Sequence, residues 1–176
     1  AFLLGEDFIG DDNVVLILGD NIFYGQGLGE KLGKALECRS GATVFTYPVK
    51  NPVAFGVISY DQNGAPNHIE EKPVNPRSNF ALTGLYFFDN DVVRIAANVE
   101  PSKRGELEIT DVLRDYMDCG KLNVIEFGRG FAWFDTGTHE SMFQASMFVD
   151  AIQNRQGLQI ACLEEIAFRK GLITVD

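Results

Sequence analysis

The fold is decided by residues 14–21, VVLILGDN, where the apolar run Val14–Leu18 ends in turn residues. An uninterrupted apolar run of this length, bounded by a turn, is typical of a central strand buried on both faces of a helix-covered sheet. Apolar residues then recur at helical spacing over residues 28–36, and Ala42–Val49 is rich in strand-forming residues. The sequence therefore predicts a β-α-β unit with the spacing of a parallel crossover.

The rest of the chain continues the alternation of strands and helices. Phe55–Tyr60 and His68–Lys72 flank Asp61–Gly64, a turn of the hairpin kind. Further strands are expected at Leu82–Phe88, Leu122–Phe127 and Phe131–Phe134. One helix is expected after Asp89 or Asn90, either of which can cap it, and another from about Thr138 to Gln156. Between them, a helix is indicated by an apolar stripe made of Ile109, Val112, Leu113, Tyr116 and Met117. This pattern predicts an α/β fold, a mixed sheet with helices on its faces.

Composition narrows the classes of function. The 176 residues suffice for one domain with a substantial core, with 45% hydrophobic and 23% charged residues. A net charge of -10 argues against nucleic acid as a partner. An acidic protein that binds phosphates needs a few basic side chains at the site, or a metal ion, to offset the repulsion from its own negative charge.

Location follows from what the sequence lacks. No apolar run approaches the roughly 18 residues of a membrane span, and the first residues lack the basic leader of a signal peptide. Cys38, Cys119 and Cys162 are odd in number and far apart, so they indicate neither a disulfide framework nor a zinc site. We expect no membrane partner and a cytoplasmic location.

A glycine-rich stretch, Gly25–Gly29, follows the first strand by several residues and contains no lysine. A dinucleotide fingerprint would need a third glycine that is displaced here. We interpret the stretch as a flexible loop that enters a helix.

Two aspartates end predicted strands. Asp20 follows Val14–Leu18 and Asp135 follows Phe131–Phe134. Carboxylates at the C-terminal ends of strands lie where open α/β sheets bind ligands, and together they could hold Mg²⁺, which takes one or two carboxylates. The alternative is that both are caps, with Asp135 or Thr136 capping the helix that follows.

Two cations accompany further carboxylates. Glu71 and Lys72 precede Pro73, which favours an extended Lys72 and lets both side chains border one cleft. Lys72 could bind a phosphate as a point charge, and Glu71 could accept hydrogen bonds from sugar hydroxyls. Arg104, just before a helix, could bind phosphate bidentately. Solvated surface charges are the alternative for all three.

The order of the motifs is more specific than any one of them. They are Leu18–Gly25 (LGDNIFYG), Phe55–Val57, Glu70–Pro73 (EEKP), Leu82–Tyr86 (LTGLY), Arg104–Asp111 (RGELEITD) and Trp133–Thr138 (WFDTGT). In this order they closely resemble the bacterial glucose-1-phosphate thymidylyltransferases, a family of sugar-phosphate nucleotidyltransferases. The resemblance covers essentially the whole chain, including the tail Glu164–Gly171. Phe55 departs from it, since many members have tyrosine there.

The resemblance implies a Rossmann-like α/β nucleotidyltransferase domain with a mixed, mostly parallel sheet flanked by helices. It implies transfer of a thymidylyl group from dTTP to glucose 1-phosphate, giving dTDP-glucose for dTDP-rhamnose and surface polysaccharide. It also implies a homo-oligomer, a tetramer in this family. By the same resemblance Asp20 and Asp135 are Mg²⁺ ligands, Lys72 and Arg104 hold the sugar phosphate, and the glucose pocket is lined by Asn21, Gly56, Glu71 and Leu82.

The family also begins with a β-α unit bearing a Gly-x-Gly-x-Arg loop and base-reading residues, which these residues do not contain. We therefore expect residues 1–176 to be a single, truncated domain without the family's C-terminal helices, inactive alone and prone to aggregate along an open sheet edge. The alternatives are a related uridylyl- or guanylyltransferase, whose choice of base lies in the missing segment, or a non-catalytic sugar-phosphate-binding regulatory subunit.

Overall fold

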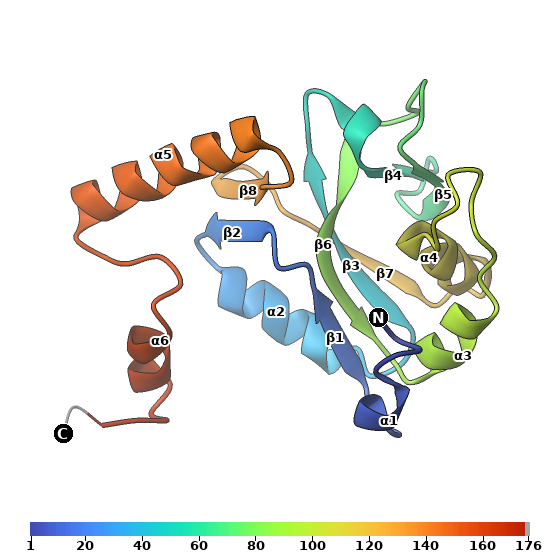
Figure 1. The fold of residues 1–176 in the computed structure, drawn as a ribbon, viewed down its shortest axis with the longest axis horizontal. Coiled ribbons are helices and arrows are strands. Elements are labelled where there is room, and N and C mark those ends of the chain that lie inside the picture. Colours follow the sequence, from blue (N-terminus) through green and yellow to red (C-terminus); the bar gives the residue numbers. More distant parts are fainter. Residues whose placement is uncertain (175–176) are drawn as a thin grey trace.

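The computed structural model describes residues 1–174, which form a sheet with helices on both faces and a small second sheet beside it (Figure 1). The strands of the main sheet are β1 (Val14–Ile17), β3 (Ala42–Pro48), β4 (Gly56–Tyr60), β5 (Pro66–Glu71), β6 (Phe80–Phe88) and β7 (Leu122–Glu126). The small sheet pairs β2 (Asn21–Gly25) with β8 (Phe131–Asp135). The helices are α1 (Glu6–Ile9), α2 (Leu28–Glu37), the 3₁₀ turn η1 (Pro52–Ala54), α3 (Asp91–Ala97), α4 (Ile109–Asp118), α5 (His139–Gln156) and α6 (Leu163–Arg169).

Strand β6 is the centre of the main sheet. It pairs antiparallel with β3 along one edge, and with β1 and β4 along the other. Strand β7 adds parallel to β3, and β5 adds antiparallel to β4 as the second strand of a hairpin. The α/β class and the mixed, helix-flanked sheet are thus confirmed.

Two apolar cores lie on the two faces of this sheet. One core joins α3 and α4 to the sheet, and it contains Val92, Leu113 and Tyr116 among its buried members. The other packs α2, through Ala35, against Phe45 and a group of aromatic side chains that includes Phe87, Phe127 and Phe131. Side chains of β6 alternate between the two, as the pleat of a strand requires, with Tyr86 and Phe88 in the first core and Leu85 and Phe87 in the second.

Local signals explain where the helices begin and end. Helix α4 lies on the sheet with its expected apolar stripe, and Gly120 follows it with a positive φ of 67°. Helix α5 begins with a capping box between Thr138 and Ser141, and ends at Gly157 in the left-handed region. The glycine-rich stretch leads into a helix, as interpreted, but the connection is only the turn at residues 26–27, because Gly25 ends β2 and Leu28 begins α2 after Gly27 with a φ of 79°.

Within residues 1–174, Val14–Leu18 does not form the buried central strand that was predicted. Strand β1 pairs with β6, and its other edge has no partner strand in residues 1–174. Alternate residues of β1 face outward, since Val15 and Ile17 are 43% and 59% exposed. An apolar run cannot tell a strand buried on both faces from one with an exposed apolar face, because both lack polar alternation.

The prediction of a mostly parallel sheet was wrong for the described pairings. Strands β1 and β3 run in the same direction on either side of α2, as the β-α-β pattern indicates, but antiparallel β6 lies between them. Within residues 1–174, β3 and β7 are the parallel pair of this sheet. The long range of the β6 pairings explains the error, since spacing along the chain does not say which strand will be inserted between two others.

Helix α5 extends away from the main sheet on the side of β2 and β8, and α6 lies below it in the view of Figure 1. Several apolar side chains of the two helices are exposed, among them Met142, Phe143, Met147, Leu163 and Phe168. Within the described residues, none of the helices combines the length and the apolar character that a bilayer crossing requires.

Candidate active site

The small sheet brings together two segments that are far apart in the sequence. Antiparallel pairing of β2 with β8 places Asn21 opposite Asp135. The loop after β8 then turns back to the residue before β2, because the Thr136 N–H donates to the Asp20 carbonyl at 2.8 Å. The two aspartates of the predicted metal site therefore lie side by side at the same end of this sheet.

Their carboxylates border one small space beside Gly137. A methyl group built on Gly137 would lie 3.0 Å from Asp135 Oδ1 and 3.8 Å from Asp20 Oδ2. The Gly137 N–H donates to Asp135 Oδ1 at 2.9 Å, and Asn21 Nδ2 donates to Asp20 Oδ1 at 2.9 Å. Each carboxylate keeps acceptor capacity beyond these bonds, since an ionised carboxylate has about four lone-pair sites.

This arrangement fits a hard divalent cation such as Mg²⁺. Mg²⁺ is usually bound through one or two carboxylates and keeps several waters or substrate phosphates as its other ligands. In residues 1–174 no group of three or more His, Cys, Asp or Glu side chains is placed to hold a metal ion, so a cation between Asp20 and Asp135 would take its other ligands from water or substrate.

The alternative that Asp135 or Thr136 caps the following helix was wrong, whereas the local turn role is present, because Asp20 lies in a turn and Asp135 accepts from Gly137 N. Thr138 caps α5 with its own side chain, and Thr136 Oγ1 donates to the Asp20 carbonyl instead. Asp89 and Asn90 were expected to cap α3, but neither side chain makes a capping hydrogen bond to this helix, because both bond to other segments. Asp89 accepts from Gly41 N and from the Tyr116 hydroxyl, while Asn90 Nδ2 donates to the Gly10 and Asp12 carbonyls.

A pocket of about 170 Å³ opens next to Asp135. It contains all the residues predicted for the glucose pocket, together with Lys72 and Asp135. Its lining is Leu18, Asn21, Ala54, Phe55, Gly56, Glu71, Lys72, Leu82, Gly84, Tyr86, Ile109, Thr110, Trp133 and Asp135. Six separate sequence segments thus meet in one mixed polar and apolar cavity, the usual character of a small-molecule site.

Asn21 joins this pocket to the carboxylate pair. Its Oδ1 accepts from Gly84 N at 3.0 Å and from Trp133 Nε1 at 2.6 Å, and its Nδ2 donates to Asp20. A Cβ at position 84 would lie 2.7 Å from the Asn21 side chain, so Gly84 is required for this approach. The Asn21 amide is therefore fixed in one orientation by bonds to three different segments.

Gly56 makes room for the polar floor of the pocket. A Cβ built on Gly56 would lie 2.9 Å from Thr110 Cγ2, 3.2 Å from Glu71 Oε2 and 3.2 Å from Leu82 Cδ1. Thr110 and Leu82 are buried, so neither can move aside easily. Any larger residue at position 56 would therefore displace the Glu71 carboxylate.

Glu71 is the partly buried acid of the site. Burial raises the pKa of the Glu71 carboxyl, and the nearby Glu108 carboxylate raises this pKa further, while Lys72 and Arg104 oppose the shift. A desolvated carboxylate with cations on one side is suited to accept hydrogen bonds from hydroxyl groups.

Lys72 has a backbone conformation that the sequence did not indicate. Its φ is 42°, in the left-handed region, whereas Pro73 led us to expect an extended residue. The Lys72 N–H donates to the Phe55 carbonyl at 3.0 Å, which continues the β4–β5 pairing past its end and turns the chain. Glu71 and Lys72 consequently border the same pocket, as predicted, through a bend and not through an extended strand end.

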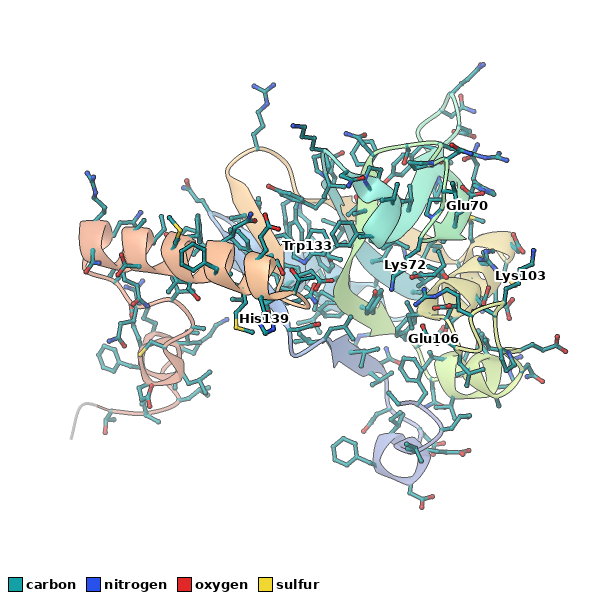
Figure 2. The ribbon with its side chains drawn as sticks, turned by 45° about the horizontal axis from the view of Figure 1, so that its top comes forward. Glu70, Lys72, Lys103, Glu106, Trp133 and His139 are labelled. Atoms are coloured by element: carbon teal, nitrogen blue, oxygen red, sulfur yellow. The ribbon has the colours of Figure 1, made fainter. Side chains whose placement is uncertain are left out.

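Arg104 lies beside the pocket and not in its lining. It borders a neighbouring hollow of about 330 Å³ that shares Glu71 with the pocket. Arg104 Nη1 lies 3.7 Å from Glu71 Oε1 and 3.7 Å from Glu108 Oε1, and Nη2 lies 2.8 Å from Glu106 Oε2. The Arg104 side chain is 41% exposed, so its guanidinium is accessible to an anion that approaches from solvent. Figure 2 shows Lys72, Lys103 and Glu106 on this part of the molecule, with Trp133 toward the small sheet.

Trp133 and Thr110 line the pocket although neither was predicted as a site residue. Trp133 is buried, contacts the Phe55 ring in a tilted arrangement at a ring-centroid distance of 5.1 Å, and donates its Nε1–H to Asn21. Thr110 is fully buried beside Gly56 and lines the pocket at the start of α4. Their position inside the motifs RGELEITD and WFDTGT was the signal that could have identified them.

Residues 1–152 match the family described as nucleotidyl transferase. The chain belongs to this family. Nucleotidyl transferases with known names resemble it closely: glucose-1-phosphate thymidylyltransferase of Neisseria meningitidis serogroup A is 56% identical over 99% of this chain and 60% of its own length. The protein of the same name from Mycobacterium tuberculosis is 49% identical over 98% of this chain and 60% of its own length. The chain thus spans 60% of the length of these relatives.

Solved nucleotidyl transferase structures have the same fold. A Bacillus anthracis structure that carries the name glucose-1-phosphate thymidylyltransferase superposes with a TM-score of 0.73 at 40% identity, and covers 82% of this chain and 57% of that one. A UDP-glucose pyrophosphorylase in complex with UDP-glucose gives a TM-score of 0.73 at 24% identity, covering 88% of this chain and 61% of that chain. The second similarity concerns the fold alone.

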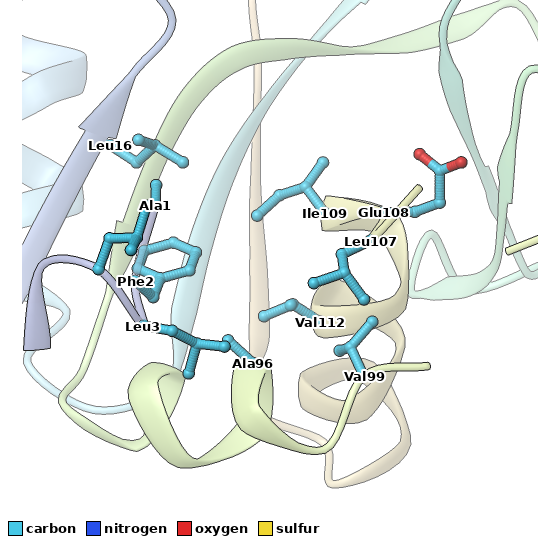
Figure 3. A pocket seen from close by; sticks show the side chains of 11 residues that line it. Ala1, Phe2, Leu3, Leu16, Ala96, Val99, Leu107, Glu108, Ile109 and Val112 are labelled. Atoms are coloured by element: carbon cyan, nitrogen blue, oxygen red, sulfur yellow. The ribbon is translucent and has the colours of Figure 1, made fainter. Parts of the chain in front are cut away.

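A separate hollow of about 430 Å³ lies between the N-terminal residues, β1 and the helices α3 and α4 (Figure 3). Apart from Glu108 its lining is apolar, and it includes Phe2, Leu16, Val99 and Ile109. It offers few polar groups to orient a sugar phosphate, so the pocket beside Asp135 is the better candidate for the active site.

Proposed function

We propose that this chain carries the sugar-phosphate and metal side of a glucose-1-phosphate thymidylyltransferase active site. The reaction transfers a thymidylyl group from dTTP to glucose 1-phosphate and yields dTDP-glucose and pyrophosphate. The observation that carries the proposal is the convergence of Asp20 and Asp135 on one space, directly beside a pocket that contains Glu71 and Lys72. The names of relatives 49–56% identical to the chain support the choice of substrates.

Both substrates are polyanions, so the barrier is largely charge repulsion and misalignment. A phosphate oxygen of glucose 1-phosphate attacks the α-phosphorus of dTTP in line and displaces pyrophosphate, without a covalent enzyme intermediate. Mg²⁺, when bound by Asp20 and Asp135, supplies positive charge that offsets the developing negative charge on the phosphates.

The remaining roles belong to side chains of the pocket and its rim. Lys72 binds the phosphate of glucose 1-phosphate as a point charge, and Arg104 binds the same phosphate after exchanging its contact with Glu106. Glu71 accepts hydrogen bonds from glucose hydroxyls, and Gly56 and Leu82 shape the wall around the sugar. Asn21 closes the pocket next to the metal ligands. Holding the attacking phosphate in place lowers the entropic part of the barrier.

We extend the proposal to the setting of the enzyme. Residues 1–176 belong to one nucleotidyltransferase domain, and the product enters dTDP-rhamnose synthesis for surface polysaccharide in the cytoplasm. The protein assembles as a homotetramer. Light scattering of the full-length protein tests the assembly, and a mass other than four chains would contradict it.

The decisive experiment measures pyrophosphate release by the full-length protein from glucose 1-phosphate with dTTP, UTP, GTP, CTP and ATP in turn, with and without Mg²⁺. We expect the highest kcat/KM with dTTP, and no release after removal of Mg²⁺. A preference for UTP or GTP would make the protein a uridylyl- or guanylyltransferase. Binding of glucose 1-phosphate without release from any nucleotide would leave a regulatory sugar-phosphate-binding protein.

A further inference from the structure

One residue joins the segments that carry the two aspartates. Thr136 follows Asp135 directly, and both its N–H and its Oγ1–H donate to the backbone carbonyl of Asp20, at 2.8 Å and 2.9 Å. The two residues are 116 positions apart in the sequence. A backbone carbonyl has two lone pairs, so Thr136 occupies the full hydrogen-bonding capacity of the Asp20 carbonyl.

The segment that carries Asp20 is exposed and is held mainly by hydrogen bonds. Residues 18–20, between β1 and β2, are exposed, with Leu18 at 40%. Strand pairing of Asn21 with Asp135 and hydrogen bonds, more than side-chain packing, therefore determine where the Asp20 backbone lies relative to Asp135. The segment is held by the bond from Leu18 N to the Gly84 carbonyl and by the pairing of Asn21 with Asp135. The two bonds from Thr136 add to these and act on the Asp20 carbonyl itself, and the bond from the Thr136 hydroxyl is the one that a side-chain substitution can remove.

A capping role does not account for the Thr136 hydroxyl. Helix α5 is capped by Thr138, whose Oγ1 accepts from Ser141 N at 3.1 Å. The Thr136 hydroxyl is directed to a different segment of the chain, two residues before that cap. Its contact therefore concerns the relation between the two loops and not the start of the helix.

We infer that Thr136 is a positioning residue for the metal site, one that sets the separation of the Asp20 and Asp135 carboxylates through the Asp20 carbonyl. This inference rests on the proposed metal role of the two aspartates. Mg²⁺ demands near-ideal octahedral geometry, so its affinity depends on the spacing of its ligands. Groups that hold ligands in place from the next shell of contacts typically change metal affinity when they are removed.

The test compares Thr136→Val with Thr136→Ser in the full-length protein. Valine retains the branched shape and the N–H but loses the hydroxyl, whereas serine retains the hydroxyl. Binding of Mn²⁺ is measured in the absence of substrate, through the decrease of the electron paramagnetic resonance signal of the free ion. This measurement gives the Kd of the metal site itself. We expect the Kd for Mn²⁺ to rise about 3- to 10-fold in Thr136→Val, the effect of one lost hydrogen bond, and to change less than about 2-fold in Thr136→Ser.

Two further measurements separate positioning from general structural damage. The KM for glucose 1-phosphate should stay within about 2-fold of the wild-type value in both variants, because Thr136 does not line the pocket. An equal Kd for Mn²⁺ in the wild type and Thr136→Val would overturn the inference alone. Parallel losses of Mn²⁺ binding in Val and Ser variants would also overturn it. A wild-type protein that binds no Mn²⁺, or whose binding survives Asp20→Asn and Asp135→Asn, would refute the metal assignment itself.

Discussion

Gly56→Ala is the sharpest test of the pocket, because one methyl group enters it at a known place. The added Cβ lies 2.9 Å from Thr110 Cγ2 and 3.2 Å from both Glu71 Oε2 and Leu82 Cδ1. Thr110 is fully buried and Leu82 is 5% exposed, whereas the Glu71 side chain is 17% exposed. The carboxylate is therefore the neighbour that moves.

The size of the effect follows from the cost of overpacking. Forcing an extra methyl group into a packed site costs about 1–3 kcal/mol. Movement of the Glu71 carboxylate relieves the contact but removes an acceptor from the proposed glucose site. If the whole cost appears in sugar binding, the KM for glucose 1-phosphate rises about 5- to 150-fold. The KM for dTTP should change much less, because the affected residues lie in the sugar pocket.

Steady-state kinetics of pyrophosphate release in the full-length protein, with each substrate varied in turn, measures both constants. Gly128→Ala is the matched control, because a Cβ at position 128 meets no atom within 4 Å and its φ is not in the left-handed region. Circular dichroism and thermal unfolding check that both variants fold. The reasoning is refuted if Gly56→Ala folds and retains the wild-type KM for glucose 1-phosphate.

Three other perturbations probe the metal pair and Glu71. Asp20→Asn and Asp135→Asn should each lower kcat about 100- to 1000-fold, the effect of losing about 2.7–4 kcal/mol of preorganised electrostatic stabilisation, with the thermal midpoint largely retained; near-normal rates in both would remove the metal assignment. Gly137→Ala places a methyl group 3.0 Å from Asp135 Oδ1 and should weaken Mn²⁺ binding. Gly19→Ala is the control, because its Cβ meets nothing within 4 Å and Mn²⁺ binding should not change. Equal Kd values for the two variants would show that the ion does not occupy the space beside Gly137. Because burial raises the pKa of Glu71 in the folded protein, folding favours its protonated form, and the stability that this contributes is lost as pH rises through the raised pKa. Glu71→Gln should therefore raise the thermal midpoint near pH 7, with a difference from wild type that shrinks toward about pH 4, while it raises the KM for glucose 1-phosphate; a difference that grows on acidification would contradict the direction of the shift.

The order of the local elements could be predicted from the sequence, because each depends on residues that are close together in the chain. The hairpin turn at Asp61–Gly64 is an example, since Asp61 Oδ1 accepts from Asn63 N and Ala65 N within the turn itself. The stripe of α4 and the end of α5 at Gly157 are likewise local. The residues proposed for the glucose pocket were predicted from the resemblance of ordered motifs, and the structure places them in one pocket.

What the sequence by itself determined is therefore most of the strands and helices, although not β2, α1 or α6, and the family to which the motifs belong. The tertiary structure alone decided that β6 enters between β1 and β3, that Lys72 bends back toward the pocket, and that Thr136 and Asn21 connect the Asp20 and Asp135 segments. The physical reason is range. A turn or a cap is settled by bonds a few residues long, whereas the meeting of two carboxylates more than a hundred residues apart depends on strand pairing and on which apolar faces are buried together.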